Sequence, residues 1–404
     1  MKLCFTQSRR ALVRGVLTLA LALVGSAAAA PSSSNEVEAA LIRTFAALDA
    51  GRMSVALKEI DIVLKKYPNF RLGHLIRGDI LMAQAGKPTA LAPVGANAEE
   101  LADLRQEARL RLKHLLNPRP ANTLPAAIVR LSTNHQHAFI LDSEKSRLYV
   151  FKNVAGKPEY VTDYYVTVGK LGDYKQREGD QRTPVGVYFV TSEITKKLPD
   201  LYGSGAFALN FPNELDRRAG RTGSGIWLHG TPSNTYSRPP RASDGCVVLS
   251  NDDLASIRQY VNPGSTPVVL AASLAWKTPE QWRKTSADVL AAVESWRYDW
   301  EKRNVDSFIT HYSTKFDTQG LALATWKAEK RASLAAPTGT QPLKVTLANL
   351  SVFAYPTAAN SPPMMMVSFE QTFKTSRNSV KLKKSQYWQF ENGSWQIIHE
   401  AIAS

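Results

Sequence analysis

The sequence predicts a multidomain protein in which a helical domain, a mainly β domain and an α+β domain follow one another. With 404 residues, the chain is long enough for two or three domains of ordinary size. Its apolar residues recur with helical spacing up to about residue 116, then alternate as in strands, and then form one helix followed by long strands. Hydrophobic residues make up 44% and charged residues 21% of the chain. This composition excludes wholesale disorder and a polytopic membrane protein.

Residues 1–30 have the three-part pattern of a secretory signal peptide. Arg9, Arg10 and Arg14 precede an apolar run at 16–24, and a run of small residues follows. The apolar run is shorter than the roughly 20 residues that cross a bilayer. We therefore expect cleavage, a periplasmic mature protein and no transmembrane span in it, with an uncleaved N-terminal anchor as the alternative.

The chain is basic, with a formal net charge of +15 at pH 7. An exported basic protein meets carboxylate-rich envelope polymers and anionic membrane surfaces, and both attract such a charge. No helix-turn-helix, zinc-finger or aromatic RNA-binding pattern accompanies the charge, so we expect no nucleic-acid partner.

Residues 31–117 predict the helical domain. Apolar residues recur at steps of three and four in 37–48 and in 57–64. A third helix, at 72–85, resembles the first at an offset of roughly 34 residues, which is the period of tetratricopeptide (TPR) repeats. We therefore expect a TPR-like domain that contacts protein partners. A plain helical bundle fits the pattern equally well.

A proline-rich linker at 117–125 precedes the mainly β domain, which we place at 126–272. Its expected elements are short strands separated by glycine-rich turns, with a single helix near the end. The strands are expected at 138–151 (a pair), 160–168, 186–192, 225–228 and 267–271, and the helix at 251–260.

Residues 280–404 predict the α+β domain. A helix at 286–303 precedes four long strands, and Glu391, Asn392 and Gly393 form a good hairpin turn between the last two. The strands are expected at 343–355, 364–373, 380–390 and 394–400. This pattern indicates helices packed against a curved antiparallel sheet. We expect this domain, like the helical domain, to offer a surface for protein partners.

The chemistry is predicted to centre on Cys246, the one thiol that remains after Cys4 leaves with the signal peptide. An unpaired thiol in an oxidising compartment is a liability unless it has a chemical role. His229 stands at the end of a predicted strand, with 16 residues between it and Cys246, and a histidine is the usual base for such a thiol. Gly245 lets the backbone approach a substrate, so that its amide and that of Cys246 could bind an oxyanion. The alternative is a buried, inert cysteine.

These residues resemble the L,D-transpeptidase catalytic domain of bacterial wall enzymes, whose signature is His-Gly, a loop, and Ser/Thr-His-Gly-Cys. An upstream segment also resembles the family's Gly-Asp-x-x-Thr-Pro-x-Gly motif, and the resemblance covers 126–272. The matching upstream residues are Gly179, Asp180, Thr183, Pro184 and Gly186. Two positions depart from the family's pattern: Asp244 replaces the usual second His, and Val248 stands where many members have an Arg.

The resemblance implies that Cys246 is the nucleophile, His229 the base and Gly230 the residue whose carbonyl orients that base. It also implies a substrate: the tetrapeptide stem of peptidoglycan, cut between diaminopimelate and the terminal D-alanine through a thioester. An acceptor amine would make the enzyme a transpeptidase, and water an L,D-carboxypeptidase. The three-domain layout resembles L,D-carboxypeptidases that shape cells, whose last domain is nuclear-transport-factor-2-like. A non-catalytic wall-binding scaffold is the remaining alternative.

Several loop residues beside the motif are candidates for substrate binding. Stem peptides end in carboxylates, which arginine binds well, and we single out Arg241 and Arg218. Ser243 and Asp244 precede the thiol, and Asp244 either holds a cationic amine or caps the turn. No carboxylate or cysteine cluster completes a zinc site around the nearby histidines of this domain, so we expect neither metal nor cofactor.

Overall fold

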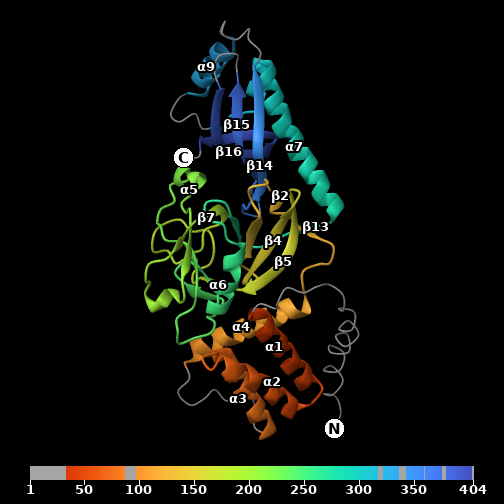
Figure 1. The fold of residues 1–404 in the computed structure, drawn as a ribbon, viewed down its shortest axis with the longest axis vertical. Helices are drawn as coiled ribbons and strands as arrows, with labels where there is room; N and C mark the ends of the chain where they lie inside the picture. Colours follow the sequence, from red (N-terminus) through yellow and green to blue (C-terminus); the bar gives the residue numbers. More distant parts are fainter. Residues whose placement is uncertain are drawn as a thin grey trace, which may run out of the picture.

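The computed structural model describes three domains that lie in a row along the long axis, with the helical domain at one end and the α+β domain at the other (Figure 1). The described residues are 33–86, 97–316, 322–335, 343–358, 360–374 and 379–402. This arrangement confirms the predicted fold class. The expected signal peptide at 1–30 lies outside the described residues. Within them, no helix combines the length and the apolar character needed to cross a membrane.

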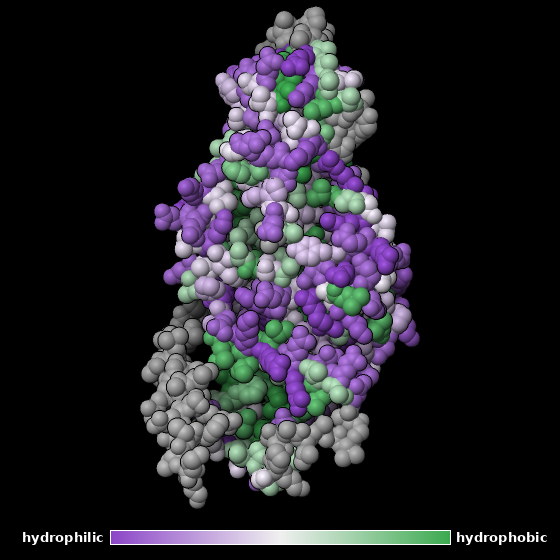
Figure 2. All heavy atoms as spheres, turned by 180° about the vertical axis from the view of Figure 1, so that it is seen from behind, coloured by the Kyte–Doolittle hydropathy of each residue, from purple (hydrophilic) through white to green (hydrophobic). Residues whose placement is uncertain are grey.

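The described part of the helical domain, 33–86 and 97–117, contains four helices. They are α1 (Ser33–Asp49), α2 (Met53–Lys66), α3 (Arg71–Gln84) and α4 (Ala98–Leu116). Their apolar faces form a common core around Leu41, Ile60 and Phe70, as the helical spacing predicts. Hydrophobic residues also gather on the outside of this domain, at the lower part of the face in Figure 2. The helical region is thus confirmed, whereas its TPR-like character stays a prediction.

The middle domain is built on an eight-stranded sheet with the strand order β11-β9-β8-β7-β12-β3-β4-β5. Its strands are β3 (His137–Asp142), β4 (Arg147–Val154), β5 (Lys157–Tyr165), β7 (Gly186–Ile194), β8 (Ala206–Leu209), β9 (Trp227–His229), β11 (Val247–Val248) and β12 (Pro267–Ala271). A small second sheet joins β6 (Val168–Gly169) to β10 (Arg241–Ser243). Two short helices, α5 (Glu214–Arg218) and α6 (Asn251–Ile257), complete the domain, and a 3-10 turn continues α6 over Arg258–Tyr260.

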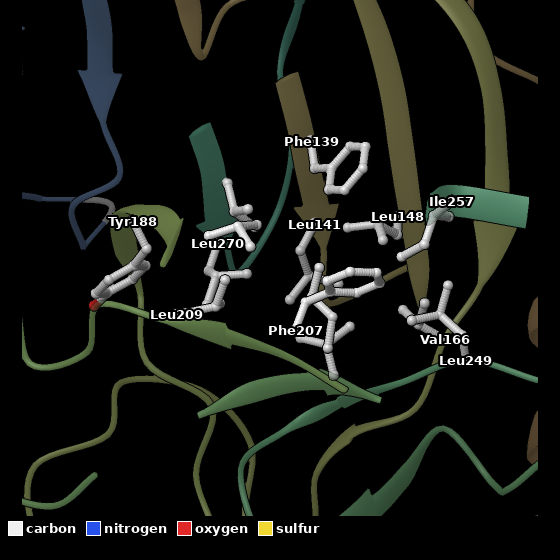
Figure 3. Close-up of a cluster of buried hydrophobic side chains, with 14 of the residues drawn as sticks. Phe139, Leu141, Leu148, Val166, Tyr188, Phe207, Leu209, Leu249, Ile257 and Leu270 are labelled. Atoms are coloured by element: carbon white, nitrogen blue, oxygen red, sulfur yellow. The ribbon is translucent and has the colours of Figure 1, made fainter. Parts of the chain in front are cut away.

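Alternating side chains from these strands form one dry core. Phe139, Leu141, Leu148, Phe207 and Leu270 point toward one another in Figure 3 and are almost fully buried. Burial of a side chain of this size stabilises the folded state by about 1.5–3 kcal/mol. The core therefore provides a rigid support for the strand ends that carry the candidate site.

The α+β domain packs helices against a five-stranded antiparallel sheet. Its elements are α7 (Pro279–Lys302), α8 (Val305–Thr310), α9 (Leu323–Ala335), β14 (Lys344–Tyr355), β15 (Met364–Lys374), β16 (Ser379–Glu391) and β17 (Ser394–Ile402). Helix α7 begins with a capping box between Thr278 and Gln281. Trp296 on α7 and Trp388 on β16 are fully buried between helix and sheet. Strand alternation sends Met365 into this core and Met366 to the opposite face.

Two short strands near the start of the middle domain pair outside its eight-stranded sheet. Strand β2 (Ile128–Arg130) pairs with β14 and becomes the fifth strand of the C-terminal sheet. Strand β1 (Leu124–Pro125) pairs with β13 (Trp276–Lys277), directly before α7. No strand was predicted at 128–130, and the domain bounds 126–272 stay a prediction. The middle and C-terminal domains share a strand and a core, and form a continuous body.

Candidate active site

The sheet register brings the segments of His229 and Cys246 side by side. His229 is the last residue of β9, and Cys246 directly precedes β11. The two strands are parallel, with Val247 beside Leu228 and Val248 beside His229. The backbone N–H of Leu249 donates to the His229 carbonyl at 2.9 Å. Short strands anchored in the core thus hold both ends of the loop at one place.

The Gly230 carbonyl sets the tautomer of the His229 imidazole. Its Nδ1 lies 2.7 Å from the Gly230 carbonyl oxygen, which can only accept, so Nδ1 carries the proton and Nε2 keeps its lone pair. The ring is 3% exposed, and Tyr202 packs edge-on against it at 5.1 Å between centroids. Burial, helped by the charge of Arg238 and opposed by the bond to Gly230, lowers the pKa of His229 to about 4. The imidazole is therefore neutral at pH 7.

The Cys246 thiol is also neutral at rest. Burial raises its pKa to about 11, and the charge of Asp244 adds to this rise. A backbone N–H bond from Trp227 to the sulfur and the positive charges of Lys175 and Arg238 oppose it. The thiol donates to the Gly225 carbonyl at 3.3 Å. The thiol of Cys246 and the imidazole of His229 are thus both neutral at pH 7.

The turn before the nucleophile depends on Gly245 and Ser243. Gly245 has a φ of +126°, and a Cβ there would lie 2.6 Å from the Arg182 carbonyl oxygen, so only glycine fits. The Ser243 hydroxyl donates to the Cys246 carbonyl at 2.6 Å and accepts from the Gly245 N–H at 3.2 Å. Ser243 therefore shapes the turn. The Gly245 amide, expected to face an oxyanion, is paired with Ser243 in this resting structure.

The upstream motif contacts the nucleophile's turn. Buried Thr183 donates to the Gly245 carbonyl at 3.1 Å and accepts from the Gly169 N–H at 2.9 Å. Asp180 accepts from Lys175 Nζ at 2.7 Å and from three backbone amides. Burial alone would raise the pKa of Asp180, but these bonds outweigh it and lower the pKa to about 2. The motif thus forms a wall that fixes Lys175 near the sulfur.

Asn251 holds the loop that follows the base. Its Oδ1 accepts from the Ser204 N–H at 2.8 Å, and its Nδ2 donates to the Thr231 carbonyl at 2.9 Å. A Cβ at Gly230 would lie 2.1 Å from Asn251 Oδ1, so the glycine of the His-Gly pair is needed for this close approach. The sequence analysis did not single out Asn251, although it lies just after the cysteine strand.

The two substrate arginines named from the sequence have different positions. Arg241 pairs with Asp173 at 3.3 Å, and its buried Nη1 has no hydrogen-bond partner among the described residues. Arg218 instead donates to the carbonyls of Ile398 at 2.8 Å and Lys315 at 3.4 Å, both in the C-terminal domain. The structure places Arg218 at the contact between domains, and its role in substrate binding stays a prediction.

Arg238 is one of the loop arginines beside the motif, and the sequence did not rank it above the others. Its charge acts on His229, Asp244 and Cys246, and burial lowers the pKa of its own guanidinium. Its Nη2 donates to the carbonyl of Ala242. Like Arg241, it lies in the loop between His229 and Cys246, and that position was the available signal. Asp244, by contrast, is exposed and accepts from Gln181 Nε2 at 3.0 Å.

No cluster of three or more His, Cys, Asp or Glu side chains that could hold a metal occurs in the described part of the chain. The histidines at the start of the middle domain contact rings instead: His135 packs against Phe189 and His137 against Tyr260.

Comparison with known families identifies two of the three domains. Residues 136–270 match the L,D-transpeptidase catalytic domain, and residues 288–401 match the Cds6 C-terminal NTF2-like domain. YafK of Escherichia coli K12, whose name assigns it to the L,D-transpeptidases, is 31% identical over 120 residues. That match covers 26% of this chain and 44% of YafK, so the chain spans less than half the length of this relative.

Two solved structures are similar over most of their length. Bd1075 of Bdellovibrio bacteriovorus is 27% identical with a TM-score of 0.60, covering 70% of this chain and 98% of that chain. The helical cell shape determining protein Pgp2 from Campylobacter jejuni is 23% identical with a TM-score of 0.57, covering 68% and 95%. These findings confirm the resemblance read from the sequence: an L,D-transpeptidase catalytic domain precedes an NTF2-like domain.

Proposed function

We propose that this chain is an exported enzyme that acts on peptidoglycan tetrapeptide stems, with Cys246 as nucleophile and His229 as base. The observation that carries the proposal is the orientation of His229. Its Nδ1 donates to the Gly230 carbonyl, and its strand, β9, pairs with β11, the strand that follows Cys246. The L,D-transpeptidase domain match supports the substrate class.

In the proposed reaction, Nε2 of His229 takes the thiol proton while the sulfur attacks the carbonyl between diaminopimelate and D-alanine. The tetrahedral intermediate collapses, the C–N bond breaks, and the leaving amine takes the proton from His229. D-Alanine departs and a thioester remains on Cys246. An incoming amine or water then gives its proton to His229, attacks the thioester and regenerates the thiol.

The first candidate for the second half-reaction is transfer to the amine of another stem, which makes the enzyme an L,D-transpeptidase. The second candidate is hydrolysis to a tripeptide stem, an L,D-carboxypeptidase activity with a role in cell shape. Fold similarity to Pgp2, a helical cell shape determining protein, over nearly all of that chain supports the cell-shape role of this second candidate.

The test is incubation of the protein without residues 1–30 with purified tetrapeptide-stem muropeptides, followed by mass analysis. Dimers that have lost one D-alanine establish transfer, and tripeptide stems alone establish hydrolysis. A Cys246→Ala variant is the control and should give neither product. If the wild type also gives neither, the enzyme proposal fails and the wall-binding scaffold replaces it.

We also propose export, which rests on the pattern at 1–30, and protein partners for the helical and C-terminal domains. Fractionation of cells that express the full chain tests the first. Recovery of the protein in the cytoplasm with residues 1–30 intact would contradict it.

A further inference from the structure

A groove lies between the helical domain and the loop that connects His229 with Cys246. Its volume is about 220 Å³. Arg71, Glu100 and Leu104 line it from α3 and α4, and Ser237 and Arg238 line it from the loop. The groove therefore borders the loop that connects the two candidate catalytic residues, and the charge of Arg238 also acts on both of them.

The loop wall of the groove is fixed by the helical domain. The Ser237 hydroxyl donates to Glu107 Oε1 at 2.8 Å, and Glu107 is 1% exposed. The Tyr236 N–H donates to the Asn69 carbonyl at 3.2 Å. The Tyr236 ring packs against Tyr67, with 4.5 Å between ring centroids. A wall held in this way is preorganised, so a ligand does not have to order it on binding.

A buried ion network continues from this wall to Arg238. Arg111 on α4 pairs with Glu107 at 2.9 Å, and its guanidinium lies 3.8 Å from the centre of the Tyr165 ring. The Tyr165 hydroxyl donates to the Arg238 carbonyl at 3.0 Å. The backbone of Arg238 is thus linked through Tyr165 to Arg111 on helix α4.

The charges in the groove match a zwitterion better than a sugar. Arg71 and Glu100 form an ion pair at 3.1 Å with both side chains about half exposed, and Arg238 adds a second cation. An exposed pair contributes at most about 1 kcal/mol, so a ligand with both charges can replace it at little cost. None of the lining residues is aromatic, whereas sugar rings commonly stack on aromatic faces.

We propose that this groove is a second binding site for a peptide stem, with Arg71 and Arg238 binding carboxylates and Glu100 binding the ammonium of the diamino acid. The inference rests on the proposed function and extends it, because it gives the helical domain a direct part in substrate binding.

The test is a titration of the Cys246→Ala protein with a soluble tripeptide stem that ends in diaminopimelate, followed by calorimetry. Arg71→Met and Glu100→Gln should each raise the Kd about threefold to fivefold. Acetylation of the ligand's free amine should weaken binding to the Cys246→Ala protein by the same factor, but should not weaken binding further when Glu100→Gln is present. The matched control is the exposed pair Arg43–Glu59 in the same domain, whose neutralisation should leave the Kd unchanged.

An unchanged Kd in both groove variants would overturn the proposal, as would tight binding of a stem-free chitooligosaccharide that these variants weaken. Because the thiol is replaced, the measurement does not depend on turnover. Failure of the enzyme proposal would appear instead as missing products with wild-type protein and intact binding.

Discussion

The rate of alkylation of Cys246 and the rate of turnover of the enzyme should depend differently on pH. Burial raises the pKa of the thiol to about 11 and lowers that of His229 to about 4, so both groups are neutral between these values. At pH 7 a thiol with a pKa of about 11 is ionised in about one molecule in 10⁴. A thiol of ordinary pKa, about 8.5, is ionised in about three molecules in a hundred.

The assay compares two rates between pH 6 and pH 9. Alkylation by iodoacetamide requires thiolate and should rise about tenfold for each pH unit, with no plateau. The kcat/KM for D-alanine release should stay flat, because the neutral pair is the reacting form throughout this window. A His229→Gln variant should be alkylated at nearly the wild-type rate while losing turnover.

A plateau of fast alkylation below pH 7 would refute this reasoning. It would mean that the resting enzyme holds a thiolate–imidazolium pair. Such a pair requires the pKa of the thiol to fall below that of His229, the reverse of what burial does here.

Three further predictions concern stability and the roles of single residues. Burial lowers the pKa of His229 from 6.5 to about 4, so the unfolded chain binds more protons than the folded chain between these two pH values. The free energy of unfolding should therefore fall by up to about 3 kcal/mol as the pH drops through this range. Urea titrations at pH 7 and 4.5 should show the fall in the wild type and not in His229→Gln, and equal falls in both proteins would contradict the burial argument. Arg218→Ala should lower the melting temperature and keep kcat/KM within twofold. Arg238→Ala should lower kcat/KM at least about tenfold. If Arg218→Ala instead lowers kcat/KM more than Arg238→Ala does, Arg218 belongs to the substrate site. Gly245→Ala should lower kcat/KM at least about tenfold, because the added Cβ meets a backbone carbonyl. The control is Gly264→Ala, which should keep its activity because Gly264 also has a positive φ but has open space around it. Equal activities of the two variants would show that the turn at Gly245 relaxes.

Much of the fold was predictable because long elements carry strong periodic signals. Strand β12 has the predicted bounds, and the hairpin turn at Asn392 and Gly393 adopts the positive φ angles of such turns. Strand β8 and helix α5 were missed, because four or five residues are too short to show a period. The pairing of β2 with β14 joins segments more than 200 residues apart, and no local pattern encodes it.

The candidate site was partly predictable for a similar reason. His229, Gly230, Gly245 and Cys246 lie in two short segments joined by one loop, and their residue types at this spacing indicate the proposed chemistry. Loop arginines carry no such signal, because the partner of a long cation depends on the fold. Arg218 thus reaches the C-terminal domain, and the backbone of Arg238 is linked through Tyr165 to Arg111 on helix α4, far away in the sequence.

The most direct test of the account is a double-mutant cycle on D-alanine release from a tetrapeptide stem. Cys246→Ala and His229→Ala should each lower the rate at least about 10³-fold, and the double variant should be no slower than either, because the two residues act as a unit. If either single variant keeps more than a tenth of the wild-type rate, or if the two losses multiply in the double variant, the imidazole does not serve the sulfur and the proposed catalysis is wrong.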